Sequence, residues 1–265
     1  MLCTRDIFFP EQNNKRMGRI KLEEIDTRAP GALQKEQVKL ETAGIISELN
    51  ELQNLLYAES KHSVLVVLQG MDASGKDGLI RKVFGNLNPQ GVMVHSFKVP
   101  TAEELGHDFL WRIHKNAPAK GMIQLFNRSH YEDILVTRVH NLCDKETAYK
   151  RMRAINDFEW LLAEHNNTTI LKFYLHISEK EQSLRLNERL DDKTKQWKYN
   201  ESDFAEAKLW PEYRKVYEDC FEECNKIPWT IVPADQNWYK EYIVAKKLKD
   251  ALSALKMRYP GLKKA

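Results

Sequence analysis

The sequence has no long hydrophobic run. Its longest uninterrupted apolar stretches, such as Val64–Leu68, are about five residues long, and a bilayer-spanning helix needs ~20. The opening decapeptide MLCTRDIFFP contains an acidic residue and lacks the apolar stretch of a signal peptide. These absences argue against a membrane protein, and we expect a soluble, cytoplasmic protein with no membrane partner.

Cysteine is scarce, with four residues in a chain of 265. Cys220 and Cys224 have the i,i+4 spacing of one helix face, whereas Cys3 and Cys143 stand alone. A metal site on the pair is one interpretation, but no neighbouring His or Cys completes a set of four ligands. Free thiols in a reducing compartment are the favoured interpretation.

An excess of one charge is also missing. The chain has 41 Lys and Arg residues against 38 Asp and Glu residues, a formal net charge of +3. This balance argues against a nucleic-acid-binding surface, so a local cluster of basic residues must hold any polyanionic ligand. The length is sufficient for a sizeable core, in one large α/β domain or two small ones.

The N-terminal part predicts an arm followed by a helix. Residues 1–31 are mostly polar with interspersed proline, and are expected to be extended. The pattern over 33–59 is typical of a helix. Apolar positions recur at alternating spacings of four and three residues, so the buried face is expected to contain Val38, Thr42, Ile45, Leu49, Leu52 and Leu56. Two alternatives remain for this face: it docks on the main domain, or it docks on a second subunit.

Beyond residue 61, predicted strands alternate with predicted helices. The strands are short apolar segments at 63–69, 92–99, 121–126, 168–177 and 229–234. The helices are expected after Lys76, over 102–115, over 145–165, from the N-cap residue Ser178 with Glu181, and over 237–255. This alternation predicts an α/β fold with a parallel five-stranded sheet flanked by helices. We expect an N-terminal arm and helix over 1–61 and one α/β domain over 62–265.

The segment VLQGMDASGKDG at 67–78 almost matches the phosphate-binding loop G-x-x-x-x-G-K-[ST]. It lies between a predicted strand and a predicted helix, in the required order. Its glycines let the backbone approach phosphate oxygens, and its lysine reaches the bridging or transferred phosphate. Phosphate binding is therefore expected from Gly70, Ala73, Ser74, Gly75, Lys76 and Asp77.

Carboxylates occupy unusual positions around this loop. Asp77 replaces the Ser or Thr that usually binds Mg²⁺, and Asn127 replaces the acid expected at a nearby strand end. Asp72 is the predicted substitute, because a carboxylate among phosphates is tolerable only with a cation between them. We predict that Asp72 binds Mg²⁺ and also orients the attacking oxygen. For Asp77, the simpler interpretation is a favourable acid in the first turn of a helix.

Arginines follow the predicted third strand. Arg128 leaves that strand at the edge where α/β sheets bind ligands, and its guanidinium can clamp a phosphate with two hydrogen bonds. Arg138 lies further along the following helix. It is a candidate phosphate ligand, with a solvated helical arginine as the alternative.

The same segment, RSHYED at 128–133, contains further candidates. Glu132 and Asp133 would bind a second metal or select the acceptor, with ordinary helix acids as the alternative. His130 is interpreted as a partly buried, hydrogen-bonded residue. A phosphohistidine intermediate is disfavoured because direct in-line transfer needs no covalent stage.

A basic segment at about 184–203 predicts a lid over the loop. Arg185 and Arg189 are i,i+4 neighbours on one helix face. Lysines continue the basic series at Lys193, Lys195 and Lys198. In nucleotide kinases such lids exclude water and neutralise developing charge. Glu188, Asp191 and Asp192 dilute its charge, so a solvated face is the alternative.

Several segments together resemble one known family. They are IDTRAPG (25–31), GMDASGKDG (70–78), FKVPTAEELGHDFLWRIHK (97–115), FNRSHYEDILVTRVH (126–140), LKFYLHISEKEQ (171–182) and WKYNESD (197–203). Their combination resembles the family-2 polyphosphate kinases, and within them the subgroup that phosphorylates AMP as well as ADP. The similarity spans nearly the whole chain.

The resemblance implies a P-loop kinase fold that uses inorganic polyphosphate as phosphoryl donor with Mg²⁺. By position, Asp72 and Lys76 match the family's catalytic loop residues, and Arg128 and Arg138 match its phosphate-binding arginines. Its basic lid corresponds to Arg185, Arg189, Lys193 and Lys198.

Asn127, which we count among the catalytic residues, stands where many family members have Asp. Together with Glu132 it resembles the AMP-accepting subgroup. Adenine nucleotides are therefore the expected acceptors, and guanine nucleotides remain open. The family commonly forms dimers or tetramers, so a homodimer or homotetramer is expected.

Three functions are weighed. The first is Mg²⁺-dependent, reversible transfer of a terminal phosphoryl group from polyphosphate to AMP and ADP. The second is an ATP-dependent nucleoside monophosphate kinase related to thymidylate kinase. The third is a nucleotide-gated interaction protein that uses the 33–59 helix and has no turnover. The displaced carboxylates argue against the third.

Overall fold

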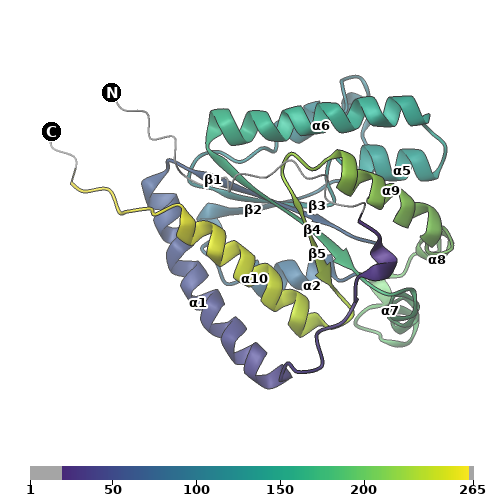
Figure 1. The fold of residues 1–265 in the computed structure, drawn as a ribbon, viewed down its shortest axis with the longest axis horizontal. Helices are drawn as coiled ribbons and strands as arrows, with labels where there is room; N and C mark the ends of the chain where they lie inside the picture. Colours follow the sequence, from purple (N-terminus) through teal and green to yellow (C-terminus); the bar gives the residue numbers. More distant parts are fainter. Residues whose placement is uncertain (1–19, 263–265) are drawn as a thin grey trace.

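A computed structural model describes residues 20–262. A single sheet of five parallel strands has the order β2–β3–β1–β4–β5 (Figure 1). The strands are β1 Ser63–Gln69, β2 Val92–Ser96, β3 Ile123–Asn127, β4 Thr168–His176 and β5 Trp229–Pro233. The predicted parallel five-stranded sheet is confirmed, although β2 ends three residues before the predicted end at Val99.

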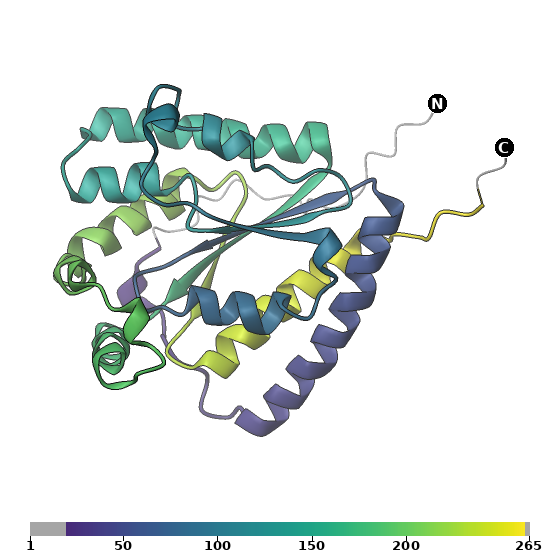
Figure 2. The ribbon, with the colours of Figure 1, turned by 180° about the vertical axis from the view of Figure 1, so that it is seen from behind.

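Helices cover both faces of the sheet (Figures 1 and 2). On one face lie α5 Glu132–Val139, α6 Lys145–Asn166 and α9 Trp210–Glu223. On the other lie α1 Lys35–Glu59, α2 Lys76–Leu79 with the π-helix η2 Ile80–Phe84, and α10 Asn237–Ala254. The remaining elements are η1 Leu22–Glu24, η3 Pro89–Gly91, α3 Ala102–Leu105, α4 Trp111–His114, α7 Glu179–Asp191, η4 Gln196–Lys198 and α8 Glu201–Ala207.

The central strand explains why the sheet is stable. All seven residues of β1 are buried, because β3 and β4 flank it and helices cover both faces. Each fully buried Val or Leu side chain contributes about 1.5–3 kcal/mol of transfer free energy. β2 lies at the edge, where Met93 and Val94 are half exposed. The core therefore fixes β1, and with it the start of the loop that follows.

Helix α1 docks on the main domain, which was one of the two alternatives for its apolar face. Val38, Ile45, Leu49 and Leu56 are buried, and α1 lies alongside α10 (Figures 1 and 2). On the opposite side Leu40 is exposed. The seam of alternating four- and three-residue steps is thus an intramolecular contact.

The prediction of one continuous helix over 102–115 is wrong. A capping box between Thr101 and Glu104 starts α3, but the helix ends after one turn. The Leu110 amide then donates to the Asp108 carboxylate at 2.9 Å, which starts a second turn, α4. Local side-chain caps have therefore divided a periodic segment into two short helices.

The N-terminal arm crosses the turn between β5 and α10. The Thr27 hydroxyl donates to Asp235 Oδ2 at 2.8 Å, and the Asp235 amide donates to the Thr27 carbonyl at 3.0 Å. The Ala29 amide donates to Gln236 Oε1 at 2.8 Å. These contacts attach the visible part of the arm to the turn; Cys3 and the opening decapeptide lie outside the described residues.

Two predictions about composition can be placed on the fold. Cys143, Cys220 and Cys224 are free thiols, and the last two are buried in the core. Between residues 20 and 262, no helix has both the length and the apolar character that crossing a membrane requires.

Candidate active site

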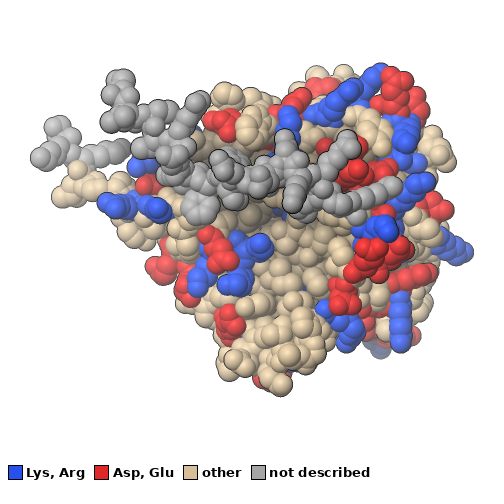
Figure 3. All heavy atoms as spheres, in the orientation of Figure 1, with Lys and Arg blue, Asp and Glu red and all other residues tan. Residues whose placement is uncertain are grey.

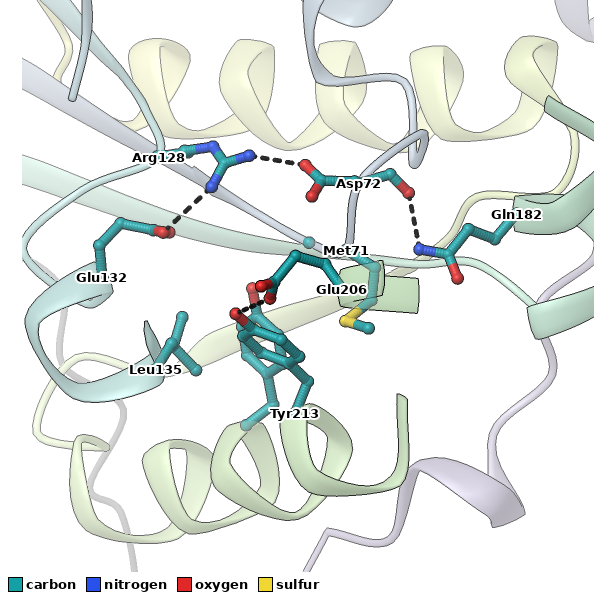
Figure 4. Close-up of a pocket in the computed structure, with 10 residues that line it drawn as sticks. Met71, Asp72, Arg128, Glu132, Leu135, Gln182, Glu206 and Tyr213 are labelled. Carbon is teal, nitrogen blue, oxygen red and sulfur yellow. Dashed lines mark hydrogen bonds and ion pairs between the residues drawn. The ribbon is translucent and has the colours of Figure 1, made fainter. Parts of the chain in front are cut away.

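The candidate site lies at the carboxyl edge of the sheet, where β1 and β3 end side by side. Leu68 of β1 pairs with Asn127 of β3, and the Arg128 amide donates to the Leu68 carbonyl at 3.1 Å. The strand order reverses around β1, and open α/β sheets bind ligands in the crevice at such a reversal. The loop after β1 therefore faces the segment after β3 (Figure 4).

The loop after β1 has backbone conformations that few residues tolerate. Gly70, Ala73 and Gly75 have φ values of 152°, 60° and 90°. A Cβ on Gly70 would lie 2.9 Å from the Leu175 carbonyl oxygen, so only glycine fits against β4 at that point. Left-handed residues within such a loop turn successive amides toward one side, and this geometry binds anions. The strain at Ala73, which has a Cβ, is typical of a functional loop.

Lys76 is buried at the start of α2, with its ammonium group inside the loop. Its Nζ donates to the carbonyl oxygens of Gly70 at 2.7 Å and of Met71 at 3.2 Å. Burial lowers the pKa of Lys76, and the charge of Arg128 lowers it further, while Asp72 opposes both. An ammonium group offers three donors, so a phosphate oxygen can replace or join these carbonyls.

Asp72, Arg128 and Glu132 form a charged triad (Figure 4). Arg128 donates from Nη2 to Asp72 Oδ1 at 2.6 Å and from Nη1 to Glu132 Oε2 at 3.3 Å. Burial would lower the pKa of Arg128, but Glu132 and Asp72 outweigh it and raise that pKa. Arg128 also has a left-handed φ of 62°, an unfavourable conformation that recurs at functional sites. Three predicted site residues thus converge.

The triad lines a small cavity that α7, α8 and α9 close. Gln182 of α7 donates to the Asp72 carbonyl at 3.1 Å, and Tyr213 of α9 donates to Glu206 Oε2 of α8 at 2.6 Å (Figure 4). Burial, together with Glu206, raises the pKa of Tyr213. The cavity has a volume of about 30 Å³, close to the space that one water molecule occupies. This cavity is too small to hold a nucleotide.

Asp77 connects the loop to the lid. Its carboxylate accepts from Asn127 Nδ2 at 3.0 Å and from Lys198 Nζ at 2.9 Å. Partial burial would raise the pKa of Asp77, but these two hydrogen bonds outweigh burial and lower it. Asp77 is therefore more than an acid in the first turn of a helix, because it links the end of β3 to the lid.

The lid arginines hold backbone and acidic groups. Arg185 donates to the Ala73 and Ser74 carbonyls at 3.2 Å each, and also to the carbonyls of Ala234 and Asp235. Arg185 therefore braces the loop from outside. The remaining lid residues are placed as follows: Arg189 pairs with Asp203 and donates to the Lys198 carbonyl, and Lys193 is exposed.

The surface around these helices carries both signs of charge. Figure 3 shows Lys and Arg side chains interspersed with Asp and Glu over the side of the molecule that α7 and α8 form. Neither sign dominates there. Attraction of a polyanion must therefore arise within the site, from the loop amides, Lys76 and Arg128.

Two predicted site residues point elsewhere. Arg138 Nη1 donates to Asp219 Oδ2 of α9 at 2.6 Å, and Arg138 does not line the cavity. Asp133 pairs with Arg112, whose Nη2 lies 3.3 Å from Asp133 Oδ2. Burial raises the pKa of Asp133, although Arg112 opposes that shift. Of the two neighbouring acids, only Glu132 faces the site.

His130 is fully buried behind the site. Its Nε2 lies 3.1 Å from Glu159 Oε1, in a network with Tyr131 and Lys172. The interpretation of His130 as a buried, hydrogen-bonded residue agrees with this arrangement. The other histidines of the described chain form no metal-binding group with Cys, Asp or Glu.

Several site residues were missed by reasoning from sequence. Glu206, Tyr213 and Tyr217 come from α8 and α9, a region for which no helix was predicted. Pro211 in the first turn and the buried Tyr217 and Phe221 were usable helix signals. Lys240, which contacts the loop at the Ser74 carbonyl, was also missed. It is a single lysine on a predicted helix, and no local pattern distinguishes it from an exposed lysine.

Known proteins are similar over most of the chain. The family model for polyphosphate kinase 2 matches residues 32–260. The chain is 48% identical over 247 residues to an AMP/ADP-polyphosphate phosphotransferase of Meiothermus ruber, covering 92% of both chains. It is 42% identical over 229 residues to an ADP-polyphosphate phosphotransferase of Rhodopseudomonas palustris, covering 81% of this chain and 79% of the relative.

A solved structure is similar as well. The crystal structure of polyphosphate kinase 2 from Arthrobacter aurescens TC1 superposes with a TM-score of 0.90 at 42% identity, covering 94% of this chain and 90% of that one. The two chains therefore share one fold over most of their length. The chain is a member of the polyphosphate kinase 2 family, as the motifs had predicted.

Proposed function

We propose that the protein transfers the terminal phosphoryl group of inorganic polyphosphate to AMP and to ADP, forming ADP and ATP, reversibly and with Mg²⁺. The observation that carries this proposal is the 48% identity to a relative named AMP/ADP-polyphosphate phosphotransferase, over 92% of each chain. In the reaction, the terminal phosphoanhydride P–O bond of the donor breaks. A new P–O bond forms to an oxygen of the nucleotide phosphate, and the donor becomes one phosphate shorter.

The chain's own residues supply charge and position for this step. The loop amides and Lys76 would hold the donor's terminal phosphates, and Arg128 would bridge donor and acceptor from the end of β3. The attacking nucleotide phosphate is already anionic, so no strong general base is required. This fits a site in which the nearest carboxylates, Asp72 and Glu132, are paired with a guanidinium.

The site residues fit a Mg²⁺ ion that the substrates help to bind. Asp72 and Glu132 offer two carboxylates beside the loop, both hydrogen-bonded to Arg128. Mg²⁺ is usually held by one or two carboxylates together with substrate phosphates. When bound, the ion would neutralise charge between donor and acceptor phosphates.

The lid would control entry of both substrates. Lys198 pairs with Asp77 of the loop, and Arg189 pairs with Asp203 within the lid. A polyanion that enters the loop competes for Lys198, so binding of the donor would release this contact and reorganise the lid. Lys193, which is exposed, is free to follow the donor chain.

Nucleotide selection is assigned to Glu132 and Asn127. Glu132 lines the cavity, and Asn127 is held by Asp77 at the end of β3. An uncharged residue at this strand end reduces repulsion of an acceptor phosphate, whether the acceptor is AMP or ADP. Acceptance of guanine nucleotides is left to measurement.

One donor–acceptor matrix tests the proposal. Purified protein is incubated with polyphosphate or ATP as donor, and AMP, ADP, GMP or GDP as acceptor, with and without Mg²⁺. Chromatography of the products is expected to give ADP and ATP from polyphosphate and AMP, only when Mg²⁺ is present. No product with polyphosphate, together with strong turnover of a monophosphate by ATP, would establish the alternative of a nucleoside monophosphate kinase.

The same preparation addresses assembly. We propose a homodimer or homotetramer, and light scattering coupled to gel filtration would give the mass directly. A mass equal to the 31.1 kDa of one chain would contradict this part of the proposal.

A further inference from the structure

A second lysine contacts the phosphate-binding loop from behind. Lys240 lies in the first turn of α10, and only 1% of its surface is exposed. Its Nζ donates to the Ser74 carbonyl at 3.0 Å and to Asn237 Oδ1 at 2.8 Å. Buried lysines are uncommon because removing the ammonium group from water is costly, so a specific contact must compensate.

The contact with Ser74 determines the direction of the following amide. A trans peptide is planar, so the carbonyl of one residue and the N–H of the next point in opposite directions. Because the Ser74 carbonyl points to Lys240, the Gly75 N–H points away from Lys240. Arg185 donates to the same carbonyl and to that of Ala73, at 3.2 Å each. Two cations from α7 and α10 thus hold the loop carbonyls outward.

The fit is close enough to restrict the loop sequence. A Cβ on Gly75 would lie 2.1 Å from Lys240 Nζ, which is far inside van der Waals contact. The φ of 90° at Gly75 also disfavours any other residue. A side chain at Gly75 would therefore displace the Lys240 ammonium group from its present position.

We propose that Lys240 is a positioning residue for donor binding: by holding the Ser74–Gly75 peptide, it aims the loop amides at the terminal phosphates of the donor. The inference rests on the proposed function. It goes beyond that function in adding a residue that does not touch the substrate and that lies far along the chain from the loop. Loss of Lys240 should therefore affect the donor and spare the acceptor.

The charge of Lys240 adds a dependence on pH. Burial lowers the pKa of Lys240 to about 7, with Arg185 and Lys76 acting in the same direction and Glu241 and Glu181 opposing. A neutral amine keeps two N–H donors, so both hydrogen bonds survive deprotonation and only the positive charge is lost. The contribution of this charge to donor affinity should therefore decline as pH rises above 7.

The test compares two buried lysines. K240M is expected to weaken binding of tripolyphosphate about five- to tenfold, the effect expected of losing one charged hydrogen bond to the Ser74 carbonyl, which then keeps only Arg185 as a donor. It should leave the KM for AMP within about twofold. Lys172 is equally buried but lies away from the loop, so K172M should lower the melting temperature and leave tripolyphosphate binding unchanged. Calorimetry measures this binding without turnover, so it separates this inference from a failure of the proposed function.

A second variant decides the outcome if K240M does not fold. K240Q keeps an N–H donor and is neutral at every pH, so it should bind tripolyphosphate more weakly than the wild type at pH 6. That difference should shrink toward pH 8.5, where Lys240 itself is neutral. Equal binding of tripolyphosphate by the wild type and by folded K240M, or by the wild type and K240Q at pH 6, would overturn the proposal.

Discussion

Two charged clusters lie close together in this chain but differ in their exposure to solvent and ligands. The first, which we call the closed cluster, joins Glu159 to His130, Tyr131 and Lys172. Glu159 and Lys172 are both fully buried. The second, which we call the open cluster, lies at the edge of the sheet and joins Arg128 to Asp72 and Glu132. In this cluster 42% of the Arg128 side chain is exposed. The first is closed to ligands, whereas the second borders a cavity.

The difference arises within a few residues after β3. Arg128 and His130 are two positions apart, yet one faces the cavity and the other faces the core. Buried polar groups must find partners within the protein, so the closed cluster contributes to stability and specificity of the fold. Groups at a crevice can exchange their partners for a ligand. Similar residue types therefore serve different purposes according to their access to solvent.

The largest effect is expected from breaking the closed cluster. Glu159→Gln removes a charge that faces Lys172 at 2.8 Å, and leaves the ammonium group buried without its partner. The free energy of unfolding should fall by about 3–5 kcal/mol, measured by urea denaturation. As a control on the same helix, Asp157→Asn breaks only the exposed pair with Lys226. It should change the free energy of unfolding by less than about 1 kcal/mol.

The same cluster gives a prediction for pH. Burial would raise the pKa of Glu159, but Lys172 and His130 outweigh it and hold that pKa below its usual value of 4.5. The stabilisation is therefore present above pH 4.5 and is lost as pH falls through the lowered pKa. The difference in unfolding free energy between wild type and Glu159→Gln should shrink in this acidic window. A difference that stays constant until the protein unfolds in acid would contradict the assignment.

The next largest effect is expected at the open cluster. Asp72→Asn should reduce turnover by at least 10²–10³-fold, on the order of losing one electrostatic contact in a transition state. Its melting temperature should stay close to that of the wild type, because Asp72 lies at the edge of the cavity. Near-normal rates at saturating Mg²⁺ would refute the metal-binding role.

A smaller effect is expected in the lid. Arg189→Ala removes the pair with Asp203 and a donor to the Lys198 carbonyl, so the KM for polyphosphate should rise about five- to tenfold. The slope of affinity against salt should also become shallower. Lys180→Ala, an exposed change on the same helix, is the matched control. The lid assignment fails if the two variants behave alike.

The smallest effect is expected at the contact between lid and loop. Asp77→Asn removes the charge that Lys198 binds, in a pair that is partly exposed on both sides. Such pairs contribute about 0–1 kcal/mol, so kcat and KM should each change by less than about fivefold. The change should vanish at high salt. A loss as large as that of Asp72→Asn would place Asp77 in the chemistry of the reaction.

Much of the fold was predictable from periodicity and from loop chemistry. The apolar run at 63–69 and the glycines after it fixed β1 and the phosphate loop, because both depend on local sequence. The helix over 102–115 was not predicted correctly, since the Thr101 and Asp108 side chains cap the backbone locally. Local caps override a periodic pattern at modest cost in free energy.

The candidate site was predictable where residues belong to the loop or follow a strand. Asp72, Arg128 and Glu132 converge as expected because parallel strands end at one edge. Residues that reach the site through tertiary packing were not predictable. Lys240 meets Ser74 across 166 positions of sequence, and Tyr213 reaches the cavity only through the packing of α9.

The arm that crosses the β5–α10 turn has a consequence for synthesis of the protein. Thr27 bonds to Asp235, which follows it by 208 positions. At a translation rate of about 5–20 residues per second, the arm leaves the ribosome on the order of ten to forty seconds before its partner. The nascent chain must therefore keep this segment undocked until the turn between β5 and α10 has been synthesised.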